Sequence, residues 1–134
     1  MRPDPDYIKC LLIAFQDAPG PTTDIKELKQ QGMPYEEPRF LFHLRLLQDQ
    51  GFVERDDGET RLGVETMLDG DSYWSVVPLR LTASGHEFAE AMGHSEAFAA
   101  VKSSLVTSSL SIMRDVAVAA FKTELSRHGI NLGL

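Results

Sequence analysis

The chain of 134 residues has a single cysteine, Cys10, and a single tryptophan, Trp74. One cysteine excludes an internal disulfide framework and any metal site built from several thiolates. Long apolar runs are missing as well, since runs such as residues 11–15 and 116–121 are far shorter than the roughly 20 residues that a membrane-spanning helix needs. The acidic, proline-containing start of the chain is unlike a signal peptide. These features predict a cytoplasmic protein that does not enter the membrane.

Positive charge is also in short supply. Lysine and arginine number 13 against 20 aspartates and glutamates, which gives a formal net charge of −7 at pH 7. Residues 54–71 carry most of this excess, with seven acidic side chains and two arginines. Proteins hold a nucleic-acid backbone through cations that displace its condensed counterions, so a segment of this sign repels phosphate. The charge distribution therefore argues against DNA binding through residues 54–71.

The N-terminal third of the chain predicts three helices. Asp4 followed by a proline is typical of a helix start, and apolar residues then recur at helical spacing: Ile8, Leu11, Leu12 and Phe15. Cys10 widens this stripe and is expected to be a buried packing residue. A short second helix should begin at Asp24 and stop at Gly32, and a third should cover residues 35–50.

Residues 52–81 predict a small β region. Short alternating apolar stretches are separated by Asp-Gly turns at residues 57–58 and 69–70, as in β-hairpins. Three more helices are expected after it, the first two capped by Thr82 and Ser95. Three helices followed by a hairpin is the order of a winged helix-turn-helix, which presents its third helix to its ligand.

The predicted fold class is therefore mainly α with a small β-wing, an α+β fold. We expect a winged helix-turn-helix domain over residues 1–93 and a helical C-terminal extension over residues 94–134. Apolar residues surround much of the last predicted helix, and a domain this small has limited means to cover both sides. Two interpretations stay open: a homodimer through Ile112, Val116, Phe121 and Leu125, or full burial within one chain.

Three blocks of the sequence stand out: residues 4–8 (DPDYI), 43–54 (HLRLLQDQGFVE) and 80–88 (RLTASGHEF). Together with the ending INLGL at residues 130–134, they resemble an uncharacterised family of bacterial and prophage proteins, catalogued only as a domain of unknown function. Ala83 departs from the aromatic residue of that family. The resemblance implies a winged-helix core, a helical C-terminal extension and an association with phage. It implies no activity and no catalytic residues.

The outward face of the predicted third helix is the first candidate site. Phe40, Leu41, Leu44 and Leu47 share its core-facing arc, and the other side is expected to carry Arg39, Phe42, His43, Leu46 and Gln50. A helix that reads DNA would offer several polar donors there, because base edges are read by bidentate hydrogen bonds. The apolar pair, Phe42 and Leu46, is either covered by the C-terminal helices or forms a face that docks to a protein.

These residues lead to two functional hypotheses. The first is a non-catalytic interaction module, associated with phage or prophage, that binds a protein partner as a regulator or inhibitor of a host system. Its expected contacts are Arg39, Phe42, His43 and Leu46 on the third helix and Asp56, Asp57, Asp69 and Asp71 on the wing. The alternative interpretation of these acids is a charged loop that only keeps the protein in solution. The alternative is a transcriptional regulator that contacts DNA through Lys26, Lys29, Arg39 and Arg45.

Catalytic and metal-binding patterns are not found in the sequence. The segment His86-Glu87-Phe88-Ala89-Glu90 lacks the second histidine, at i+4, that a zinc-protease helix requires. No Gly-x-Ser-x-Gly elbow and no glycine-rich phosphate loop occur. We therefore expect a protein that is not an enzyme and that uses no metal and no cofactor.

Overall fold

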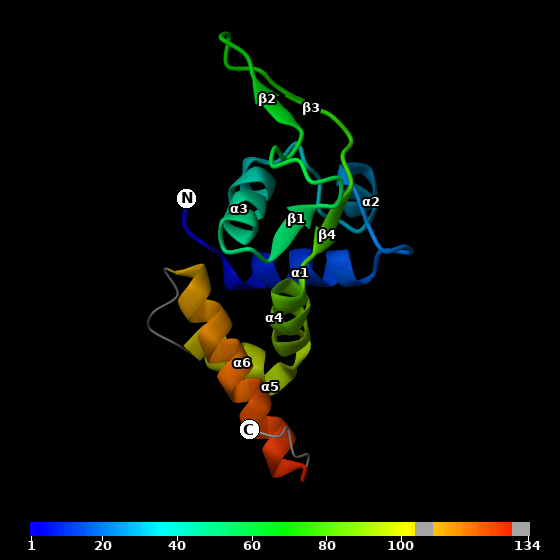
Figure 1. Cartoon of the computed structure of the whole chain (residues 1–134). Coiled ribbons are helices and arrows are strands. Elements are labelled where there is room, and N and C mark those ends of the chain that lie inside the picture. The colour runs from blue at the N-terminus through cyan, green and yellow to red at the C-terminus, as the bar shows by residue number, and fades with distance from the viewer. Residues whose placement is uncertain (104–108, 130–134) are drawn as a thin grey trace.

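Six helices and four short strands make up residues 1–103 and 109–129, the part of the chain that the structure, a computed structural model, describes (Figure 1). In chain order they are α1 (Pro5–Gln16), α2 (Ile25–Gln30), α3 (Pro38–Asp49), β1 (Val53–Arg55), β2 (Val64–Thr66), β3 (Ser72–Trp74), β4 (Leu79–Leu81), α4 (Ala83–Gly93), α5 (Ser95–Ser103) and α6 (Leu110–Arg127). The protein is thus α+β and mainly helical, which confirms the predicted class at that level.

Helix α1 begins as the sequence predicts, because the Asp4 carboxylate accepts hydrogen bonds from the backbone N–H groups of Asp6 and Tyr7, at 3.0 and 3.4 Å. Its expected apolar face is buried. The prediction for Cys10 was wrong, since this residue is exposed. Cys10 lies about 200° around the helix from Ile8, at 100° per residue, and so points away from the core.

Helix α3 starts at Pro38, three residues later than expected. A proline constrains the residue before it to an extended backbone, and Glu37 has φ −77° and ψ 132°. The helix therefore cannot reach back to Tyr35. Helix α2 starts and stops as predicted, with Asp24 as N-cap and Gly32 in the left-handed region at φ 90°.

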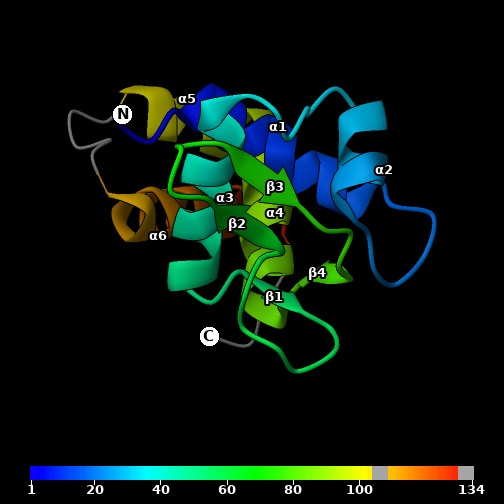
Figure 2. The same cartoon turned by 90° about the horizontal axis from the view of Figure 1, so that it is seen from above.

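Two antiparallel pairs form the β structure. Strand β1 pairs with β4, and β2 pairs with β3. Thr23, before α2, also bonds to Leu79 of β4 through two backbone hydrogen bonds of 2.7 and 2.8 Å, so that the spatial order is Thr23, β4, β1. The β2–β3 hairpin rises beyond α3, on the side away from α4, α5 and α6 (Figures 1 and 2).

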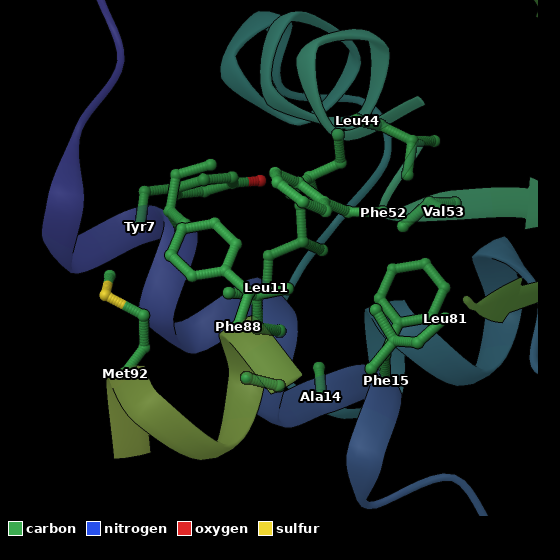
Figure 3. Close-up of a cluster of buried hydrophobic side chains, with 14 of the residues drawn as sticks. Tyr7, Leu11, Ala14, Phe15, Leu44, Phe52, Val53, Leu81, Phe88 and Met92 are labelled. Atoms are coloured by element: carbon green, nitrogen blue, oxygen red, sulfur yellow. The ribbon is translucent and has the colours of Figure 1, made fainter. Parts of the chain in front are cut away.

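Residues from both ends of the chain share one buried cluster. Tyr7, Leu11 and Phe15 of α1 gather with three residues from later in the chain: Phe52 just before β1, Leu81 of β4 and Phe88 of α4 (Figure 3). The same cluster extends to Val101 of α5 and Met113 of α6. Thr82 caps α4 as predicted, whereas Ser95 is itself inside α5, where the carbonyl of His94 accepts the first-turn bond from Phe98. This core holds α3 and the hairpin in place and leaves their outer surfaces free.

Candidate interaction surface

A groove of about 420 Å³ separates the outer face of α3 from the β2–β3 hairpin. Leu41, Phe42 and Leu46 line it from α3, and Trp74 lines it from β3. The Trp74 ring is fixed by edge contacts with Phe40 and Tyr35, each with ring centroids 5.7 Å apart. We call this hollow the α3 groove. The structure thus places Phe42 and Leu46 together, half-buried, on a concave and mostly apolar surface.

A second hollow, of about 600 Å³, adjoins the first at Arg45, which lines both. Its other polar lining includes Arg61, Gln48 and Glu65. Arg45 and Arg61 are exposed, and neither forms an ion pair with any residue in 1–103 or 109–129. We call this second hollow the arginine hollow. Arg45 could be predicted from its position on the third helix, whereas Arg61 could not, because the loop that places Arg61 beside α3 has no periodic pattern.

His43 was expected on the outer face, and that prediction was wrong. The side chain is only 2% exposed and lies about 60° around the helix from Phe40, on the core side. Its Nε2 accepts a 3.0 Å hydrogen bond from the backbone N–H of Asp4, and its Nδ1 lies 2.6 Å from the carbonyl oxygen of Arg39. An accepting Nε2 requires the proton on Nδ1, which donates to Arg39. Burial lowers the pKa of His43, so the ring is neutral and structural.

The candidate DNA contacts are divided between paired and unpaired cations. Arg39 donates to Glu37 at 2.6 Å and lies 4.7 Å from the centroid of the Tyr7 ring, and Lys29 pairs with Glu36. The hydrogen bond from Lys29 holds the pKa of the Glu36 carboxyl below its ordinary value. Among the described residues, Lys26 has no ion-pair partner and is exposed. Near the N-terminal end of α3, two of the candidate cations, Lys29 and Arg39, are therefore paired with carboxylates.

The four wing aspartates lie in two different loops. Asp57 pairs with Arg55, whose hydrogen bond lowers the pKa of the Asp57 carboxyl, and Asp56 lies 3.8 Å from Arg80. Asp69 and Asp71 sit instead at the tip of the β2–β3 hairpin, where both are exposed and form no ion pair with a described residue. Of the four aspartates, the two near the base of the wing thus have an arginine within 4 Å, and the two at the tip do not.

The hairpin tip also carries apolar side chains in water. Leu68 is fully exposed and Met67 is 51% exposed, directly before Asp69. Met67 lies one residue beyond the end of β2. Two large apolar residues directly before Asp-Gly-Asp are unusual, since hairpin turns are usually polar. This pattern in the sequence would have pointed to an exposed apolar contact.

The proposed dimer residues on α6 do not share one face. Ile112 is 39% exposed, and Val116 lies on the same side of the helix. Phe121 lies about 180° around the helix from Ile112, and its ring is 5.5 Å from that of His94 at the end of α4. Leu125 is on the same side as Phe121. The structure thus divides these four residues between an outer and an inner face of α6.

Two further kinds of feature, a metal site and a membrane-spanning helix, were sought in the described parts of the chain. Residues 1–103 and 109–129 contain no group of three or more His, Cys, Asp or Glu side chains that could hold a metal ion. Over the same ranges, the helices are too short or too polar to cross a membrane. Comparison with protein-family models, with curated proteins and with solved structures gives no match. The predicted resemblance to an uncharacterised family therefore stays a prediction.

Proposed function

We propose that this chain is a winged helix-turn-helix module that binds a protein rather than DNA. The order of its elements supports the winged-helix assignment. In that fold, a strand between the first two helices joins the strands that flank the wing, and in this chain a single-residue bridge from Thr23 to Leu79 of β4 has that place. Helix α3 then has the place of the recognition helix, and the β2–β3 hairpin has the place of the wing.

The α3 groove is the observation that carries the proposal. A recognition helix in the major groove of DNA needs a convex surface with polar donors, because it reads base edges. Helix α3 offers Phe42 and Leu46 facing Trp74 across a hollow. Concave apolar surfaces with a few polar groups are typical of sites that hold a side chain of a partner. The exposed Leu68 at the hairpin tip adds a second apolar contact.

Electrostatics supports the same choice. Lys29 and Arg39 already pair with Glu36 and Glu37, so a DNA phosphate would have to compete with these carboxylates. The hairpin tip, which would meet the duplex in a winged helix, carries Asp69 and Asp71. Each phosphate contact requires a cation that is free to displace a counterion.

The alternative function, a DNA-binding transcriptional regulator, has one observation in its favour. Arg45 on α3 and Arg61 near the base of the hairpin are exposed and unpaired within the described ranges, and both line the arginine hollow. A duplex could reach them only with the acidic tip beside it. The protein-binding proposal includes a role as a cytoplasmic regulator or inhibitor of a host system, associated with phage, as the family resemblance implies.

Affinity capture from a bacterial lysate, quantified by mass spectrometry, tests the proposal. The bait variants Phe42→Ser and Leu46→Ser remove apolar contacts of the α3 groove, and Ile112→Ser is the matched control because it removes an exposed apolar residue from α6. We expect one or more proteins to be recovered by the wild type and by the Ile112→Ser variant, and to be lost from both groove variants. Equal recovery by all four baits would contradict a role for the groove.

A further inference from the structure

The tip of the β2–β3 hairpin has the chemistry of a ligand. Leu68 is fully exposed and Met67 half-exposed, and the carboxylates of Asp69 and Asp71 follow within three residues. The backbone N–H of Asp71 donates a 3.0 Å hydrogen bond to the carboxylate of Asp69, and this bond closes the turn. The tip therefore presents an apolar anchor next to two unpaired negative charges.

The surface at the base of the same hairpin has the complementary chemistry. The α3 groove offers an apolar lining from Phe42, Leu46 and Trp74. Directly beside it, Arg45 and Arg61 face the arginine hollow, with Glu65 as the one acidic residue among its lining. Arginine binds carboxylates through paired hydrogen bonds, so two free guanidinium groups match two free aspartates.

We propose that a second copy of this chain occupies the α3 groove and the arginine hollow through its hairpin tip. Leu68 of one copy enters the α3 groove of the other, and Asp69 and Asp71 pair with Arg45 and Arg61. This inference rests on the proposed function, because it assigns a partner to the same surface. It differs from the dimer that the sequence predicts, which would use α6.

Symmetry makes the contact reciprocal. The β2–β3 hairpin rises beyond α3 (Figure 1). Its residues 64–67 line the arginine hollow, and Ser72 and Trp74 line the α3 groove. If two hairpins lie side by side and antiparallel, each tip reaches the base of the other around one two-fold axis. The assembly then closes as a dimer, and both exposed leucines are removed from water together. Within one chain, Asp69 and Asp71 form no ion pair with Arg45 or Arg61, so these charges are free to meet those of a second copy.

The dimer also occupies the surface that a different protein would need. Partner binding and dimer formation then exclude each other. The α3 groove and the arginine hollow become accessible only when the dimer dissociates, on dilution or in competition with a partner. The interface is small, and we expect a dissociation constant on the order of 10 µM, as for other small interfaces.

Sedimentation velocity on paired charge-reversal variants tests the inference. Two double variants are used: Arg45→Glu with Arg61→Glu, and Asp69→Arg with Asp71→Arg. In a dimer of either variant, residues 45 and 61 of one copy carry the same charge as residues 69 and 71 of the other and repel them. Each is expected to sediment as a monomer at concentrations where the wild type is a dimer. An equimolar mixture is expected to regain the dimer, because both contacts of the mixed pair then join opposite charges.

Two controls separate this result from others. All four substituted residues are exposed, and circular dichroism should show unchanged thermal unfolding. The variant Ile112→Glu places a charge on the outer face of α6 and should leave the dimer intact.

A wild type that stays monomeric at about 200 µM, far above the expected dissociation constant, would overturn the inference. So would dissociation by Ile112→Glu together with intact dimers of both charge-reversal variants. Neither outcome touches the capture experiment, which would still test the protein-binding function on its own.

Discussion

The backbone N–H of Asp4 donates a 3.0 Å hydrogen bond to Nε2 of His43, which joins the N-cap of α1 to the middle of α3. The Tyr7 ring, whose centroid is 4.6 Å from that of the imidazole, covers the same junction. Burial raises the pKa of the Tyr7 hydroxyl to about 12, so this group stays protonated. The position of the candidate recognition helix relative to α1 thus depends on a neutral histidine.

The stability of the fold is expected to fall in mild acid. Because burial holds the pKa of His43 below its ordinary value of 6.5, the unfolded chain takes up this proton first as the pH falls. Titration of His43 therefore leaves the free energy of unfolding unchanged above pH 6.5. Below that pH it lowers the free energy of unfolding progressively, until the pH reaches the lowered pKa. Thermal unfolding measured between about pH 7.5 and about pH 5.5 should show a falling midpoint.

The variant His43→Gln isolates this contribution. Glutamine carries an acceptor but does not titrate, so the variant should be less stable at neutral pH and should lose much of the pH dependence. His86→Gln is the matched control, because His86 is exposed at the start of α4. A pH dependence that is the same in His43→Gln as in the wild type would show that other groups produce it.

Gly85 is expected to tolerate no side chain. A Cβ placed there would lie 2.0 Å from the backbone carbonyl oxygen of Phe52, where α4 crosses the start of β1. The variant Gly85→Ala should lower the free energy of unfolding by about 1–3 kcal/mol, since backbone must shift to make room. Gly93→Ala is the control, because a Cβ at Gly93 meets nothing within 4 Å. Chemical denaturation that gives equal stabilities for the two variants would contradict the close approach.

Trp74 is a built-in reporter for the α3 groove, as the single tryptophan of the chain and a residue of the groove lining. If the hairpin tip of a second copy fills the groove, the Trp74 emission should shift to shorter wavelength as the protein concentration rises. The variant Leu68→Ser should show no such shift, and its thermal stability should match the wild type because Leu68 is fully exposed. A concentration-dependent shift that persists in Leu68→Ser would assign the change to another contact.

Local signals in the sequence predict much of the fold. Asp4, Asp24 and Thr82 cap helices as expected, since their side-chain oxygens accept bonds from first-turn amides a few residues away. The failures concern single positions on a helix face. Cys10 and His43 were assigned to the wrong sides because residue type was given more weight than angular position. At 100° per residue, Cys10 lies about 200° from Ile8 and His43 about 60° from Phe40.

The candidate site could be predicted only in part. Phe42 and Leu46 follow from the helical periodicity of α3, and both lie on the groove as the sequence indicates. The roles of Trp74 and Arg61 depend on how the hairpin folds over α3, which is a contact between distant segments. The ion pairs of Glu54 and Asp56 could not be predicted for the same reason, since their partner Arg80 lies far along the chain.

The central claim, that this winged-helix surface binds protein and not DNA, is tested most directly by fluorescence anisotropy of a labelled random-sequence duplex at low salt, where phosphate contacts are strongest. The account predicts no saturable rise in anisotropy at any protein concentration tested. A saturable rise that weakens steeply with added salt, and that is lost in the variant Arg45→Glu with Arg61→Glu, would contradict it and identify a DNA-binding regulator.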